Sequence, residues 1–159
     1  MVEVISCQLN NKSVCNAIFT IRKQVFVNEQ LVSEEEEFDS FESGSVHFLG
    51  SYNGVPAGTA RWRITKNGIK VERFAVLPEF RKMGVAAEIL KTVMSQVIPL
   101  NTLIYLHAQV SAMGFYERYG FKKEGPMFTE ANIDHYKMYF DRNFNLDSSQ
   151  NPLLKLPQP

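Results

Sequence analysis

Residues 81–86 have the types and spacing of an anion-binding turn. They read Arg-Lys-Met-Gly-Val-Ala, follow an apolar stretch that ends at Pro78, and open an amphipathic stretch with helical period. The first backbone N–H groups of a helix lack acceptors within the helix and carry the positive end of its dipole. Gly84 permits close backbone approach, and Arg81 and Lys82 add positive charge. The pattern predicts a pyrophosphate site, with a merely tight strand-to-helix turn as the alternative.

A second motif lies downstream, where residues 114–121 read Gly-Phe-Tyr-Glu-Arg-Tyr-Gly-Phe. Together the two motifs resemble those of the GNAT superfamily of acyl-CoA N-acyltransferases, (Gln or Arg)-x-x-Gly-x-(Gly or Ala) followed by Phe-Tyr-x-x-x-Gly-Phe. Residues 22–30, Arg-Lys-Gln-Val-Phe-Val-Asn-Glu-Gln, and residues 131–135, Ala-Asn-Ile-Asp-His, are similar to the ElaA-like bacterial branch. The resemblance covers roughly residues 5–139.

The resemblance implies acetyl-CoA as the donor. A strand would bind the pantetheine arm through its backbone, the turn at Gly84 would cradle the pyrophosphate, and Gln109 would stand where many members place a shorter Asn. The cofactor-binding residues that it implies are Phe74, Ala75, Val76, Arg81, Lys82, Met83, Gly84, Val85, Ala86 and Gln109.

Tyr116 falls where the family often has a tyrosine near the thioester sulfur. The resemblance therefore implies that Tyr116 protonates the departing thiolate. A phenol with a reference pKa of about 10 is able to supply that proton. An aromatic side chain of the core is the alternative for this position.

The acceptor amine must lose a proton before it attacks, so the reaction needs a base or a water chain. The candidates for the base are Glu72, His107 and His135. Glu72 shares a strand face with Phe74, because side chains two apart on a strand point the same way. Its alternative is an ion pair with Arg61 or Arg73.

His107 shares a strand face with Gln109, and a polar pair of this kind is unusual in an otherwise apolar strand. His135 lies near the end of the motif region, with a hydrogen-bonded loop histidine as its alternative. Some relatives carry a catalytic carboxylate where this chain has Ile104. The base is therefore left open among the candidates.

Seven of the 17 acidic residues lie between Glu29 and Glu42. We expect this segment to be a surface loop or short helix anchored by Phe38 and Phe41. It is either a solvated face or a field that concentrates a cationic amine acceptor near the entrance of the site. In the expected strand 55–64, alternation puts Trp62 in the core and places Arg61 and Arg63 on the opposite face. One of these arginines lines the substrate side or pairs with Glu72.

Sequence periods and turn signals predict an alternation of strands and helices. Asn10 or Asn11 caps the first helix and Ser111 the last. The expected strands are residues 2–8, 46–52, 55–64, 69–77, 102–109, 121–128 and 135–141, and the expected helices are residues 11–28, 84–98 and 111–119. Asn-Gly turns make the middle strands antiparallel, and the strand-helix-strand unit 69–109 must be parallel.

This order predicts an α/β (α+β) fold of GNAT type, a mixed, mostly antiparallel central sheet with helices on both faces. The 159 residues fit one domain, residues 1–141, followed by an irregular tail, residues 142–159. The formal net charge of zero argues against nucleic-acid binding. Cys7 and Cys15 are interpreted as ordinary thiols, with no metal site. With no apolar run of about 18 residues and no signal peptide, we expect a cytoplasmic protein without a membrane partner.

The expected function is an N-acetyltransferase that moves an acetyl group from acetyl-CoA directly to a primary amine. Neither cysteine falls in the motifs, so no nucleophile for a covalent intermediate is visible. The alternatives are a non-catalytic acyl-CoA-binding or interaction domain and a peptide or protein N-acetyltransferase. A homodimer, common in the superfamily, is left open.

Overall fold

A computed structural model describes residues 1–145 and contains one seven-stranded sheet in the order β1-β2-β3-β4-β5-β7-β6. Only β4 and β5 run parallel, and every other neighbouring pair is antiparallel. The strands are β1 Val2–Cys7, β2 Val46–Tyr52, β3 Val55–Thr65, β4 Gly68–Val76, β5 Ile104–Gln109, β6 Phe121–Glu130 and β7 Ile133–Phe140. The predicted mixed, mostly antiparallel sheet is confirmed.

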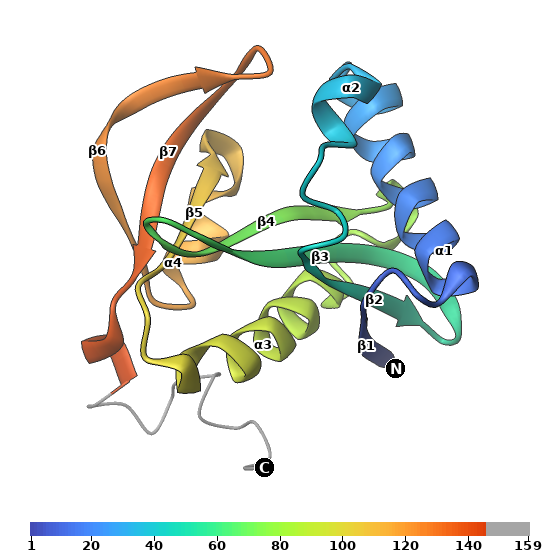
Figure 1. Cartoon of the computed structure of the whole chain (residues 1–159), viewed down its shortest axis with the longest axis horizontal. Helices are drawn as coiled ribbons and strands as arrows, with labels where there is room; N and C mark the ends of the chain where they lie inside the picture. Colours follow the sequence, from blue (N-terminus) through green and yellow to red (C-terminus); the bar gives the residue numbers. More distant parts are fainter. Residues whose placement is uncertain (146–159) are drawn as a thin grey trace.

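Helices cover both faces of the sheet, as predicted (Figure 1). The helices are α1 Lys12–Arg22, α2 Glu34–Glu37, α3 Val85–Val97 and α4 Met113–Glu117. One hydrophobic core joins α3 and α4 to the sheet, and a second core lies under α1 on the other face. Within residues 1–145, no helix has the length and apolar character that a membrane span requires.

Local sequence signals explain most element boundaries. Asn11 caps α1 by accepting a hydrogen bond from the Val14 amide at 3.2 Å. Asn53 and Gly54 both have positive φ, which the tight turn between β2 and β3 requires. On α3, Ile89, Leu90 and the rest of the apolar stripe are fully buried, as its helical period predicts.

Two boundary predictions, at the end of the first helix and at the start of the last, were wrong. The first helix changes after Arg22 into a π-helical segment, Lys23–Glu29, a change that no residue-type signal marks. Ser111 lies inside a 3-10 turn, and Ala112 stands at the cap of α4 without a side-chain hydrogen bond. The expected irregular tail begins with a 3-10 turn, Arg142–Asn145, and its remainder lies outside the described residues.

Two features of β4 open the sheet where the site lies. Its pairing with β5 is limited to Ile69 with Ile104 and Lys70 with Tyr105, so the remainder of β4 has no partner strand on that edge. Opposite β3, the register shifts by one residue between the Thr59 and Arg61 pairs. Arg73 has a φ of 60° at this bulge. Bulges re-aim side chains and end ladders, and here the strands diverge into a cleft.

Candidate active site

A cavity of about 810 Å³ occupies the space where β4 and β5 separate. Its walls come from the π-helical segment, α2, β4, β5, α4 and the turn between β6 and β7. The predicted site residues and base candidates that line it are Glu72, Phe74, Ala75, Val76, Arg81, His107, Gln109, Tyr116 and His135. The structure therefore brings together predicted side chains from β4, the turn that follows it, β5, α4 and β7.

The remaining predicted cofactor residues, 82–86, lie outside this cavity in the turn that enters α3. Gly84 is the N-cap of α3 with a φ of 84°, and no side chain among residues 1–145 caps the helix there. A Cβ added to Gly84 would meet only open space, so the turn can receive a ligand. Lys82 also has a left-handed φ, 64°, and such residues redirect successive amides toward one side. The uncapped amides of a 13-residue helix fit a pyrophosphate group.

Arg81 was predicted to add positive charge at this turn, but its side chain is already paired with a carboxylate. Both terminal nitrogens of the Arg81 guanidinium lie 2.8 Å from the carboxylate of Glu29, and its Nε donates to the Val76 carbonyl at 3.0 Å. Arg81 is thus already neutralised beside the turn, which leaves Lys82 and the backbone as the unpaired positive groups. Val85 is fully buried in the core, so only its backbone is able to contact a ligand.

Gln109 points into the cavity as the strand alternation predicted. Its Nε2 donates to Oε1 of Gln30 at 2.9 Å, which links β5 to the residue just after the π-helical segment. This hydrogen bond fixes the orientation of the Gln109 amide.

Tyr116 lies on α4 between Phe74 and Phe121, with edge-on ring contacts of 5.9 and 6.0 Å between centroids. The ring packs in the hydrophobic core, as the predicted alternative had it, and the residue also lines the cavity. Burial raises the pKa of the Tyr116 phenol above its usual value. The phenol therefore retains its proton at neutral pH.

Glu72 lines the cavity but is held by cations. The ion pair with Arg61, one of its two predicted alternatives, is observed at 2.9 Å, and Lys70 lies 3.3 Å from the other carboxylate oxygen. Arg63 completes the set and also lies over the Phe41 ring, 3.9 Å from its centroid. Burial would raise the pKa of Glu72, but Arg61 and Lys70 outweigh it and the pKa lies below its usual value. Glu72 is a poor proton acceptor in this setting.

The two histidines lie on neighbouring strands around Phe128. The His107 ring is edge-on to Phe128 at 4.9 Å, and the His135 ring stacks on it at 5.8 Å. Nδ1 of His135 lies 2.6 Å from the Ile133 carbonyl, which matches the hydrogen-bonded alternative predicted for it. His107 instead has the Glu130 carboxylate beside its Nδ1, at 3.5 Å.

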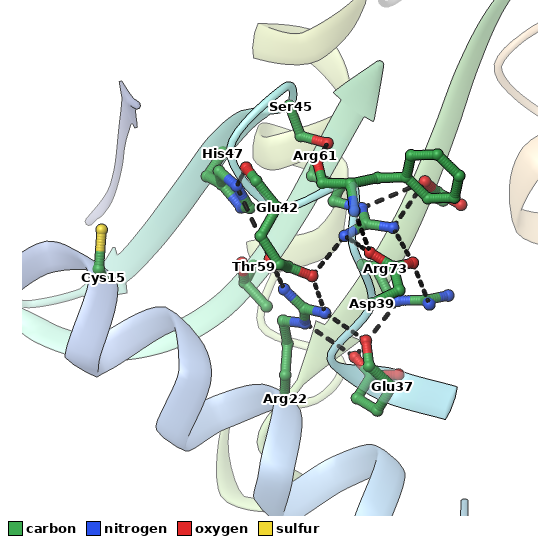
Figure 2. A network of polar contacts seen from close by, with 12 residues as sticks. Cys15, Arg22, Glu37, Asp39, Glu42, Ser45, His47, Thr59, Arg61 and Arg73 are labelled. Carbon is green, nitrogen blue, oxygen red and sulfur yellow. Dashed lines mark hydrogen bonds and ion pairs between the residues drawn. The ribbon is translucent and has the colours of Figure 1, made fainter. Parts of the chain in front are cut away.

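The acidic segment contains a short helix, α2, as one of the two predicted forms, but part of it is buried and not solvated. Four hydrogen bonds join the Arg22 guanidinium to both carboxylate oxygens of Glu42 and to the side chain and carbonyl of Glu37. Figure 2 shows Glu42 bridging the Arg22 and Arg61 guanidinium groups. Arg22, Glu37 and Arg61 are buried, so this part of the segment is structural.

The same network reaches the wall of the cavity through Asp39. Its carboxylate accepts hydrogen bonds from Arg61 at 2.7 and 3.0 Å and from Arg73 at 3.1 Å (Figure 2). Phe38 anchors the segment through an edge-on contact with Phe19, as predicted, whereas Phe41 is half exposed under Arg63. Negative charge near the cavity is therefore largely paired, and the exposed remainder is on Glu35 and Glu36.

Sequence reasoning missed Glu29, Gln30 and Glu130 as individual site residues. Glu29 and Gln30 lay within a noted motif, but their partners are 52 and 79 residues away, so no local signal named them. Glu130 directly precedes the noted run at residues 131–135, and its place at a strand end was the available signal.

Comparisons with known proteins agree with this geometry. Residues 9–141 match the model of the acetyltransferase (GNAT) domain family. The uncharacterized N-acetyltransferase YjcF of Bacillus subtilis (strain 168) is 34% identical over 136 residues, which cover 82% of this chain and 95% of YjcF. A second protein of that strain, YyaT, is 35% identical over 123 residues, 74% of this chain and 82% of its own.

Solved structures show the same fold. Escherichia coli ElaA aligns with a TM-score of 0.79 at 21% identity, covering 89% of this chain and 100% of its own. An acyl-CoA N-acyltransferase from Pseudomonas aeruginosa aligns with a TM-score of 0.78 at 20% identity and the same coverage. The chain thus belongs to the GNAT family of acyl-CoA-dependent acetyltransferases, as its two motifs predicted.

Proposed function

We propose that the protein is an N-acetyltransferase that moves the acetyl group of acetyl-CoA to a primary amine by direct transfer. The observation that carries the proposal is the alignment of an uncapped α3 amino end with the unpaired edge of β4 and the cavity beyond it. In this proposal the α3 amides and Lys82 hold the pyrophosphate, and the backbone of residues 74–76 holds the pantetheine arm. Acetyl-CoA supplies the acetyl group as a thioester.

The Arg81 side chain already contacts the backbone of residues 74–76, where the pantetheine arm is proposed to bind. The Val76 carbonyl accepts from Arg81, so this carbonyl is shared or released when the pantetheine arm binds. The other backbone groups of this edge lie beyond the last pair with β5, at Lys70. An extended ligand adding along such an edge gains backbone hydrogen bonds without a change in the sheet.

Tyr116 is proposed as the general acid for the departing thiolate. Its raised pKa keeps the phenol protonated, and its place in the wall of the cavity supports a role beside the reacting sulfur. General acid catalysis of this kind contributes about 10²- to 10⁴-fold to a rate. Glu72 is proposed to orient Arg63 and Lys70 at the acceptor end of the cavity rather than to take the amine proton.

The acceptor is proposed to be a cationic primary amine, as an amine is protonated before it reacts. The support for it is the exposed charge of Glu36, which lines the cavity, and of its neighbour Glu35, since the other carboxylates of that segment are paired. A cytoplasmic, soluble enzyme without a nucleic-acid partner is consistent with the formal net charge of zero. Residues 1–141 are proposed to be the catalytic domain.

A coenzyme A release assay tests the proposal across a panel of simple amines, polyamines, aminoglycosides and peptides. We expect release that depends on an acceptor, with selective use of one class. Release without any acceptor would indicate hydrolysis and contradict the transferase proposal. Preference for peptides would favour the protein or peptide N-acetyltransferase alternative.

Tyr116→Phe separates the enzyme from a non-catalytic acyl-CoA-binding domain. The enzyme should lose about 10²-fold or more of kcat while its affinity for coenzyme A stays within a factor of about two. Tyr119→Phe, a phenol of the turn that follows α4, is the matched control and should keep full activity. Unchanged kcat in Tyr116→Phe would contradict the proposed acid.

A further inference from the structure

His107 and Glu130 form a histidine–carboxylate pair in the wall of the cavity. Nδ1 of His107 lies 3.5 Å from Oε1 of Glu130, and the two side chains are 25% and 50% exposed. Nδ1 itself is buried and makes no hydrogen bond among the described residues. The exposed part of the ring is therefore the opposite edge, and Nε2 is the ring nitrogen available to a ligand in the cavity.

This orientation has a chemical consequence for the imidazole. A carboxylate beside Nδ1 favours the tautomer with hydrogen on Nδ1, and that tautomer leaves the lone pair on Nε2. The same carboxylate stabilises the imidazolium that forms when Nε2 takes a proton. His107 directly interacts with Glu130 and lowers the pKa of Glu130 to about 2, so this carboxylate is ionised across the neutral range.

The surrounding charges and rings define what else acts on His107. Lys70 of β4 and His135 of β7 also favour the ionised form of Glu130. Lys137 of β7 lies opposite His107 in the strand pairing, with its ammonium over the Tyr105 ring at 5.4 Å. The two lysines carry the same sign of charge as an imidazolium, and Glu130 is the carboxylate that lies beside His107. Phe128 packs on the ring edge at 4.9 Å and restricts its rotation.

Neither other base candidate has this arrangement. Glu72 is occupied by Arg61, Arg63 and Lys70 and has a lowered pKa. Nδ1 of His135 lies 2.6 Å from the Ile133 backbone carbonyl, so the backbone and not a carboxylate holds this ring nitrogen.

We propose that His107 is the general base of the transfer and that Glu130 is its positioning residue. The inference rests on the proposed function and names the group that accepts the amine proton, which the proposed function leaves unassigned. Nε2 of His107 accepts one proton from the acceptor ammonium and later releases it to solvent. The freed lone pair of the amine forms the C–N bond to the acetyl carbon, and the C–S bond of the thioester breaks.

The remaining protons balance through Tyr116. The departing sulfur takes the phenol proton, so coenzyme A leaves as a thiol. The nitrogen loses a second proton as it becomes an amide, and that proton restores the Tyr116 phenol through solvent. The net reaction releases a single proton, the one carried by His107.

The test compares pH profiles of kcat/KM for the full-length wild type, Glu130→Gln and His107→Gln, using the best amine from the release assay. Glu130→Gln should lose about 10- to 100-fold in kcat, the usual effect of removing such a positioning group. The acid limb of its pH profile should move to lower pH, because the carboxylate beside His107 Nδ1 is removed. His107→Gln should lose about 10²- to 10⁴-fold of its activity, and the acid limb should disappear from its pH profile.

Glu124→Gln removes an exposed carboxylate from the same strand and is the matched control, expected to match the wild type. His107→Ala adds a second arm, because imidazole in the buffer should restore part of its activity if a base is missing. An active wild type with unchanged rate and acid limb in Glu130→Gln would overturn the inference, as would a folded His107→Ala that imidazole does not rescue. A wild type that releases no coenzyme A with any amine refutes the proposed function instead.

Discussion

Substitution of Arg22 tests the buried ion-pair network that holds the acidic segment against the sheet. Arg22→Met removes four hydrogen bonds and leaves the Glu37 carboxylate, 3% exposed, with Arg73 at 3.4 Å as its remaining cation. Breaking one side of a buried pair costs about 3–5 kcal/mol, because the other charge stays buried without compensation. We expect a loss of that size in the free energy of unfolding.

Lys23→Met is the matched control from the next residue of the chain. Its ion pair with Glu34 has a similar length, 2.9 Å, but it is a single ammonium contact, and the side chains are 55% and 58% exposed. Solvent screens such a pair, so the expected loss is about 0–1 kcal/mol. The two substitutions thus differ in burial and in the number of contacts that they remove.

Urea unfolding at pH 7 measures both losses, with the fluorescence of Trp62, the only tryptophan, as the probe. The midpoint should fall markedly for Arg22→Met and barely for Lys23→Met, with equal m-values. Equal losses in the two variants would refute the assignment of the network as a buried structural unit. A changed m-value would show that compactness changed instead.

Three further outcomes follow from the charges around the cavity. Burial would raise the pKa of Asp39, but Arg61 outweighs it and lowers the pKa to about 2. The contribution of the Asp39 carboxylate to folding stability is therefore present above about pH 4 and is lost as pH falls toward 2. Asp39→Asn should therefore cost about 1–2 kcal/mol at pH 7, allowing for screening, and flatten the acid end of a urea-stability series. Glu29→Gln frees Arg81 and should tighten coenzyme A binding about 2- to 5-fold in a titration at low salt. High salt should abolish this gain, because it screens the charge of Arg81. Joint Glu35→Gln and Glu36→Gln substitution should raise KM for a cationic acceptor about 2- to 5-fold at low salt and leave KM for acetyl-CoA unchanged. An unchanged acceptor KM would exclude electrostatic attraction of the acceptor by these two carboxylates.

Local patterns predicted the parts of the site that depend on neighbours in sequence. Strand period placed His107 and Gln109 on one face, and both line the cavity. The position of Gly84 before an apolar helical stripe predicted the uncapped turn, because a left-handed residue and a helix start are both local properties. The Asn-Gly turns likewise predicted the antiparallel middle of the sheet.

Long-range pairing could not be read in the same way. The acidic segment has a net negative charge in sequence, yet Arg22 and Arg61, 15 to 22 residues away from their partners, neutralise its buried part in the fold. Whether Glu37 is solvated or buried depends on how α2 packs against α1, which residue types alone do not specify. The Arg81–Glu29 pair arises in the same way, from two helix ends that meet across the cleft.

Calorimetric titration with coenzyme A tests the central claim most directly, because the claim requires backbone amides at the start of α3 to bind a pyrophosphate. The wild type should bind with a measurable heat, and Gly84→Ala should bind about 10-fold or more weakly, since its φ of 84° penalises any Cβ and shifts the amides. Absence of heat with the wild type, or equal affinity in a folded Gly84→Ala, would contradict the account.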